Sequence, residues 1–151
     1  MQKHIEDKIS FLKQEVDLKI KSFEEKRTFN RKMSSYLNMT LIIISALITI
    51  FLGIEQDTYK IFFKNLALVL SASLTVLSTL DSFFNYKKLW VKYTDTTNDL
   101  KALKTDILYS CIKSDENISE QVIDKFYDRY ISILKDTNQH WIQSRLKPEQ
   151  K

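Results

Sequence analysis

The sequence predicts an all-α membrane protein, in which a two-helix transmembrane hairpin is joined to a cytoplasmic three-helix bundle. Three observations predict this class. The 151 residues include one glycine and one proline, so the chain has almost none of the residues that tight turns between strands require. Charged residues crowd into positions 1–32 and 87–151. Between them lie two apolar runs separated only by "EQDTYK". The length suits a single domain covering residues 1–151.

The first predicted element is an amphipathic cytoplasmic helix over residues 4–32. Its apolar residues recur every three or four positions, which places them on one face of a helix and charged residues on the other. Such a face requires helical partners. The apolar residues are Ile5, Ile9, Leu12, Val16, Ile20 and Phe23.

The next two elements are transmembrane helices over residues 34–54 and 61–84. Each is long enough to cross about 30 Å of hydrocarbon at about 1.5 Å per residue. The first is not typical of a signal peptide, because a charged helix precedes it and no small-residue cleavage site follows. The short connection makes the two helices an antiparallel hairpin.

The second span is predicted to continue as one cytoplasmic rod to about residue 112, because no glycine or proline interrupts it. Rotation of this rod would then move its membrane half, which places a gate in the bundle. The buried face of the cytoplasmic part is predicted to contain Tyr86, Trp90, Tyr93, Thr97, Leu100, Leu103 and Ile107.

A last cytoplasmic helix is predicted over residues 119–146, after "KSDENISE" breaks the periodicity and before Pro148. Ser119 is the expected N-cap, with Ile118 and Ile123 as a hydrophobic staple. The three charged helices have similar lengths, as a bundle needs. The buried face of this one is predicted to contain Ile123, Phe126, Tyr130, Ile133, Thr137 and Trp141.

The distribution of basic residues predicts that both termini lie in the cytoplasm. The net charge of +4 is read as charge flanking the membrane, because basic and acidic residues are interleaved, and no direct binding of nucleic acid is expected. Basic residues at the predicted inner ends of the spans are Lys26, Arg27, Arg31, Lys32, Lys87, Lys88 and Lys92, against Lys60 and Lys64 at the outer ends.

A row of hydroxyl side chains is the main candidate site. Residues at spacings of four, three and four share one narrow face of the second span, and they would line a pore. The alternative is that small hydroxyl residues let helices pack closely and hydrogen-bond to one another. Asp81 would attract cations at the cytoplasmic mouth, or simply reach the surface or pair with Lys87 or Lys88. The candidate pore-lining residues are Ser71, Thr75, Ser78 and Ser82, with Asn38, Ser45 and Thr49 on the first span.

Motifs for several kinds of chemistry are missing. With one glycine the chain has no glycine-rich phosphate loop, and it contains no G-x-S-x-G or H-E-x-x-H motif. Cys111 is the only cysteine, and His4 and His140 have no ligand pattern near them in the sequence. We therefore expect neither an enzyme nor a bound metal or cofactor.

The layout resembles the SLATT family of two-transmembrane effector domains from bacterial conflict systems. The resemblance lies in "YLNMTLIIISALITIF", the tiny loop, the aromatic "FFNY" leaving the second span, and then Trp90, Tyr93, Leu100 and Tyr109. It implies an effector that oligomerises and perforates or depolarises the bacterial inner membrane in anti-phage defence or programmed cell death. It also implies a trigger from a cytoplasmic sensor or nucleotide-signalling protein of the same system.

Two helices cannot enclose an aqueous channel, so a pore would require a homo-oligomer within the lipid bilayer. The alternative function is a non-conducting membrane adaptor whose bundle docks a cytoplasmic partner through an exposed apolar strip. A pore would depend on the sequence of its transmembrane helices, whereas an adaptor would need them only to attach the bundle to the membrane.

Overall fold

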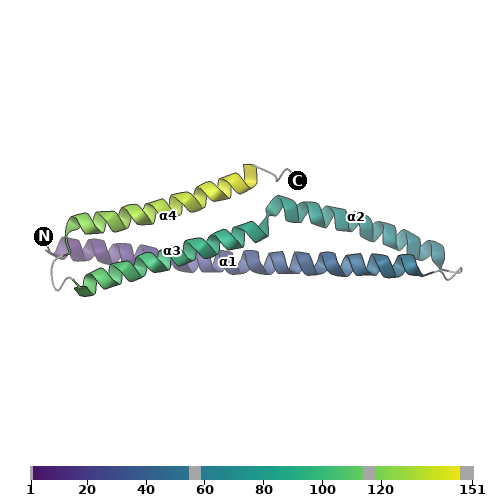
Figure 1. Cartoon of the computed structure of the whole chain (residues 1–151), viewed down its shortest axis with the longest axis horizontal. Coiled ribbons are helices and arrows are strands. Elements are labelled where there is room, and N and C mark those ends of the chain that lie inside the picture. Colours follow the sequence, from purple (N-terminus) through teal and green to yellow (C-terminus); the bar gives the residue numbers. More distant parts are fainter. Residues whose placement is uncertain (1, 55–58, 114–117, 147–151) are drawn as a thin grey trace.

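The computed structural model describes residues 2–54, 59–113 and 118–146. All the regular structure in these ranges is helical, which confirms the predicted all-α class (Figure 1). The helices are α1 (Gln2–Gly53), α2 (Lys60–Phe84), α3 (Tyr86–Lys113) and α4 (Glu120–Leu146).

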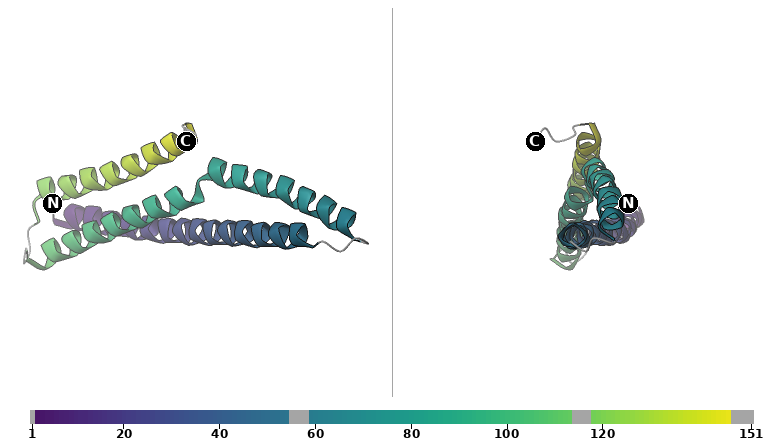
Figure 2. Two further views of the ribbon diagram at one scale, coloured as in Figure 1. Left: turned by 45° about the vertical axis from the view of Figure 1, so that its right-hand side comes forward. Right: turned by 90° about the vertical axis from the view of Figure 1, so that its right-hand side faces the viewer.

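The longest element is α1, a single helix of 52 residues that spans roughly 78 Å at 1.5 Å per residue. It joins the predicted segments 4–32 and 34–54 without a break, because no helix-breaking residue lies between them. α3 lies along its first half and α2 along its second half (Figures 1 and 2). We call residues 34–54 with α2 the apolar hairpin, and residues 4–32 with α3 and α4 the charged bundle.

The predicted rod from the second span to residue 112 is wrong at one point. α2 ends at Phe84, and Asn85 adopts the left-handed conformation with φ 51° and ψ 44°. Its N–H donates to the carbonyl of Asp81 at 2.9 Å, which caps α2, and its carbonyl accepts from Leu89 at 3.2 Å. Asparagine is the residue other than glycine that most readily adopts this conformation and ends helices with it. The chain changes direction there, as Figure 2 shows, so α2 and α3 are two rods.

The core of the charged bundle lies mainly between α1 and α3. Leu100 and Leu103 of α3 and Val16 of α1 are completely buried. Phe23 and Tyr93 pack with their ring centroids 5.8 Å apart. The predicted apolar face of residues 4–32 is confirmed, with Ile5 and Ile9 half-buried at its end. The core cluster comprises Leu12, Val16, Ile20, Phe23, Leu89, Tyr93, Leu100, Leu103, Ile107 and Tyr130.

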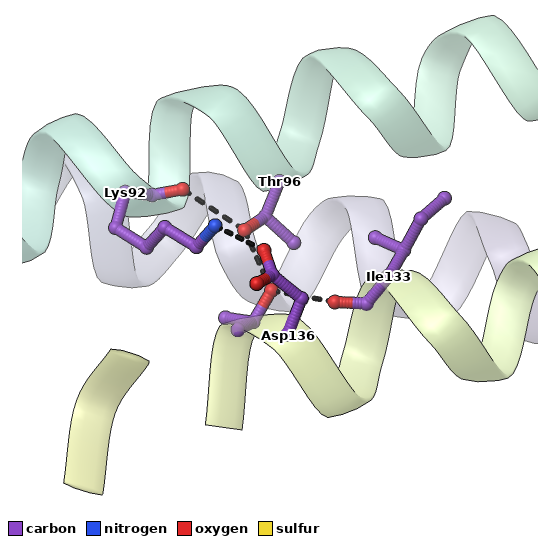
Figure 3. A network of polar contacts seen from close by, with 5 residues as sticks. Lys92, Thr96, Ile133 and Asp136 are labelled. Atoms are coloured by element: carbon purple, nitrogen blue, oxygen red, sulfur yellow. Dashed lines mark hydrogen bonds and ion pairs between the residues drawn. The ribbon is translucent and has the colours of Figure 1, made fainter. Parts of the chain in front are cut away.

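α4 packs mainly against α3, and polar groups form much of that contact. The hydroxyls of Thr96 and Thr137 are buried and lie 2.7 Å apart, and each also lies within hydrogen-bond distance of a carbonyl of its own helix (Figure 3). Because each hydroxyl has one proton, one of them donates to the carbonyl of its own helix and the other donates across the pair. Lys92 forms an ion pair with Asp136 beside them. A buried hydroxyl pair that is fully hydrogen-bonded can hold two helices in register without a large apolar core.

Further ion pairs connect α4 to its neighbours. Lys8 of α1 pairs with Glu120, and Arg129 donates to Asp106 of α3 at 2.6 Å. The hydrogen bond from Lys8 holds the pKa of Glu120 below its ordinary 4.5, and the hydrogen bond from Lys92 holds the pKa of Asp136 below 3.8. α4 is therefore attached by charged contacts around a small apolar centre.

The predicted buried face of α4 is correct only in part. Ile123, Tyr130 and Thr137 are buried, but Trp141 remains 43% exposed. The reason is that α4 diverges from α1 toward its C-terminal end, so no third helix covers that turn (Figures 1 and 2). Ser119 precedes the helix as expected, and its backbone carbonyl accepts from Val122 and Ile123.

Candidate functional site

The two helices of the apolar hairpin meet along a regular seam. Residues alternate at spacings of four and three on both helices, which is the heptad pattern of coiled coils. At the end near the short connection, the rings of Phe51 and Phe63 stack with centroids 5.5 Å apart. Most seam residues are half-buried and only Ala67 is fully buried. The seam comprises Leu37, Leu41, Ile44, Ile48 and Phe51 on α1, and Phe63, Ala67, Leu70, Leu74, Leu77 and Asp81 on α2.

Each predicted pore-lining residue comes directly after a seam residue. Ser71 follows Leu70, for example, and Ser45 follows Ile44. One residue is a rotation of about 100° on an α-helix, so these side chains lie beside the seam rather than in it. All of them are exposed. They are Asn38, Ser45 and Thr49 on α1 and Ser71, Thr75, Ser78 and Ser82 on α2.

Both rows lie on the same flank of the hairpin. On each helix, the residue after a seam residue is turned by about 100° away from the contact face. Because α1 and α2 are antiparallel and face each other, this turn directs the side chains of both helices toward the same side of the hairpin. A cavity of about 420 Å³ on this flank has Leu41 of α1 on one wall and Thr75, Ser78 and Thr79 of α2 on the other. The antiparallel packing of the two helices therefore places both rows on the same flank, which the sequence pattern of each helix alone does not require. We call this surface the hydroxyl flank.

The hydroxyl groups hydrogen-bond along their own helices. Ser71 donates to the carbonyl of Ala67 at 2.8 Å, Thr75 to that of Ser71 at 3.1 Å, and Thr49 to that of Ser45 at 3.0 Å. This bond satisfies the donor and leaves the oxygen lone pairs available to water or to another chain. Within one chain the hydroxyl row does not form the contact between α1 and α2.

The opposite flank consists of the residues that precede each seam position, and most of them are apolar. Val76 is 60% exposed and Leu80 is 42% exposed. The hairpin thus has one flank rich in hydroxyl groups, which also exposes Ile42, Leu52 and Leu68, and one flank that is mostly apolar. The exposed apolar residues of the mostly apolar flank include Ile43, Leu47, Ile50, Phe62, Val69, Val76 and Leu80.

Asp81 occupies the last full turn of the seam and is half-buried. It lines a second cavity, of about 810 Å³, with Ser78, Ser82 and Asn85 of the α2 end, Lys87 and Lys88 of α3, and His140 of α4. The sequence pattern did not predict that His140 contributes to this site, because α4 is distant in the chain. The role of Asp81 as a group that attracts cations stays a prediction.

Two helical stretches are long and apolar enough to cross a membrane, one within His4–Gly53 and one within Lys60–Ile112. Their most apolar windows are 0% and 6% buried, whereas the core helix of a soluble protein would be mostly buried. These features agree with a membrane location. Among the residues that the structure describes, no group of three His, Cys, Asp or Glu side chains could hold a metal ion.

No curated protein and no solved structure matches this chain. Residues 19–109 match one protein family. This range contains the second part of the amphipathic helix, the whole hairpin and most of α3. Because this match covers more than half of the chain, the protein belongs to the family described as "Protein of unknown function (DUF4231)".

Proposed function

We propose that this protein is a membrane effector that oligomerises and perforates the bacterial inner membrane when activated, in anti-phage defence or programmed cell death. The observation that carries the proposal is the position of both hydroxyl rows on one flank of an otherwise apolar hairpin. The resemblance to the SLATT effectors supplies the biological context.

The two flanks suit a ring of hairpins. A single hairpin in lipid would expose the polar side chains of the hydroxyl flank to acyl chains, which form no hydrogen bonds with them. In a ring, the hydroxyl flank faces water in a lumen and the flank of Val76 and Leu80 faces lipid. Hydroxyl groups hydrate such a lumen without strong selectivity between ions.

The charged bundle stays outside the hydrocarbon on the same side as both termini. Lysine and arginine residues concentrate next to the inner ends of the hairpin, as the positive-inside rule requires of a cytoplasmic side. A signal from a cytoplasmic sensor or nucleotide-signalling protein would act on this bundle. Asn85 then acts as the joint between bundle and hairpin.

Efflux of potassium from liposomes tests the proposal. Leucine at Ser71, Thr75 and Ser78 together should reduce the initial rate of efflux at least about tenfold, because a narrow apolar lumen dewets. The matched control changes Ile43, Val69 and Val76 to leucine on the opposite flank, and it should leak like the wild type. Equal leakage from the two triple variants would refute a pore lined by the hydroxyl flank.

The adaptor function has support from one part of the bundle. Phe11 and Tyr127 are 59% and 47% exposed, and they border a cavity of about 320 Å³ between α1 and α4 that an apolar partner side chain would fit. Replacing both spans by an unrelated two-span hairpin separates the two functions. An adaptor would keep its activity in such a chimera, whereas a pore would lose it.

A further inference from the structure

Two cavities follow one another along the hydroxyl flank. The cavity of about 420 Å³ lies within the hairpin and is lined by Thr75 and Ser78. The cavity of about 810 Å³, which we call the joint cavity, lies where the end of α2, the start of α3 and the end of α4 approach one another (Figures 1 and 2). Ser78 lines both cavities, so they adjoin. Together they form one path from the middle of the hairpin to the charged bundle.

The walls of the joint cavity change in character along this path. At the hairpin end they contain the hydroxyl groups of Ser78 and Ser82, which belong to α2. At the bundle end they contain charged side chains of α3, and α4 contributes His140. A roomy cavity with polar and charged walls holds water rather than acyl chains. The joint cavity therefore connects water on the side of the bundle to the hydroxyl flank.

Charges of both signs line the joint cavity in equal numbers. A further lysine, Lys92, also lines it, but the ion pair with Asp136 offsets its charge. Charged side chains at the entrance of a pore select ions by sign, and opposite charges in equal numbers oppose each other in this selection. Walls of this kind admit ions of either sign. The two carboxylates and two ammonium groups are those of Asp81, Asp95, Lys87 and Lys88.

We propose that the joint cavity is the cytoplasmic entrance of the conducting path, and that its charged walls decide which sign of ion passes. An ion enters beside the end of α4, passes Lys87 and Asp95, and reaches the hydroxyl flank at Ser82 and Ser78. Asp81 is then one of four charges at the entrance rather than a group that alone attracts cations. This inference rests on the proposed pore, and it adds the entrance and the residues that determine its selectivity.

The permeability ratio of K⁺ to Cl⁻ measures the effect of the wall charges. The purified chain is reconstituted in planar bilayers, and the ratio is obtained from the reversal potential in a KCl gradient at about 0.1 M, where charges are only partly screened. The wild type should pass K⁺ and Cl⁻ within about threefold of each other, because the wall charges balance.

Single charge changes should move this ratio in opposite directions. Lys87→Gln should raise it and Asp95→Asn should lower it, each by at least about threefold, because water weakens but does not cancel the field of a charge a few ångströms from a passing ion. Both shifts should shrink at about 1 M salt, where the screening length is about 3 Å. Lys125→Gln and Asp128→Asn make the same charge changes on exposed residues of α4 outside the cavity, and they should leave the ratio unchanged.

Chemical restoration of the charge separates an electrostatic role of Asp95 from a structural one. Asp95→Cys in a Cys111→Ser background should lower the ratio as Asp95→Asn does. An anionic methanethiosulfonate reagent attaches a negative charge to the new cysteine and should return the ratio to the wild-type value. A cationic reagent of similar size should lower the ratio further.

Three outcomes would overturn the inference: an unchanged ratio in both Lys87→Gln and Asp95→Asn, equal shifts in the control variants, or failure of the anionic reagent to restore the ratio. A strong preference of the wild type for one sign of ion would also contradict balanced walls. Absence of any conductance in the wild type would refute the pore itself. Conduction with unchanged ratios would leave the pore standing without this entrance.

Discussion

The two halves of α1 belong to one continuous helix but pack in opposite ways. In the charged bundle, α1 and α3 bury Val16, Leu100 and Leu103 completely. Among the described residues of the apolar hairpin, Ala67 is the only apolar side chain that is buried, while large apolar side chains such as Ile42 and Leu68 are 70% and 73% exposed. In water, burial of apolar surface holds helices together, whereas between helices in lipid this driving force is missing. The change along α1 agrees with a change of solvent from water to lipid.

The largest expected effect tests this difference directly. Leu100→Ala in the bundle should cost about 3 to 5 kcal/mol of unfolding free energy, because it leaves a cavity in a fully buried core. Leu74→Ala in the half-buried seam of the hairpin should cost less than about half as much, since the surrounding lipid is as apolar as leucine. Denaturant unfolding of the protein in micelles, followed by circular dichroism, measures both. Similar losses would show that the two halves share one solvent.

A lysine scan of the hairpin sharpens the comparison between its flanks. Val76→Lys places a charge on the apolar flank near the middle of α2 and should cost about 2.5 to 3.5 kcal/mol of membrane insertion. Thr75→Lys is one residue away on the hydroxyl flank and should insert almost normally, because its ammonium can reach water in the lumen. The inserted fraction is read from carbonate-resistant membrane pellets. Equal insertion of the two variants would contradict an amphipathic hairpin.

The smallest expected effect concerns the contact between α4 and the rest of the bundle. Glu120 and Asp136 have pKa values held below 4.5 and 3.8 by their lysine partners, so their ion pairs are complete above these values. The stabilisation is lost as the pH falls through the lower pKa values of the folded state. We therefore expect α4 to separate from α3 below about pH 4 before the core of α1 and α3 unfolds.

Spin labels at Asp99 and Gln139, both exposed, measure this separation in a Cys111→Ser background. The distance distribution should broaden between pH 5 and pH 3. Glu120→Gln combined with Asp136→Asn should produce part of this broadening already at pH 7. A distribution that is identical at pH 7 and pH 3 would show that apolar contacts alone hold α4.

Tyr130 connects the middle of α4 to α1. Its ring is buried in the core, and its hydroxyl lies 3.4 Å from the carboxylate of Glu15. Burial, and then the negative charge of Glu15, raise the pKa of this phenol to about 12. The side chain therefore stays neutral throughout the physiological range and anchors the middle of α4.

The sequence predicts most of the helices because their signals are local. The spacing of Leu12, Val16, Ile20 and Phe23 identifies a buried face without reference to any other segment. The break at Asn85 involves neither glycine nor proline, so the absence of those residues wrongly predicts a continuous helix, although asparagine also adopts the left-handed conformation. The periodicity does not predict that Leu89 and Thr96 are buried, because α3 contacts both α1 and α4 and its buried face is therefore wider than one stripe.

By itself, the sequence determined the helical class, the two apolar stretches and the hydroxyl rows, because each depends on residues a few positions apart on one helix. Only the tertiary structure decided that both rows lie on one flank, that Trp141 stays exposed, and that His140 meets Lys87 and Asp81 at the joint. These features depend on how helices distant in the chain are rotated and positioned against one another, and no local periodicity specifies that arrangement.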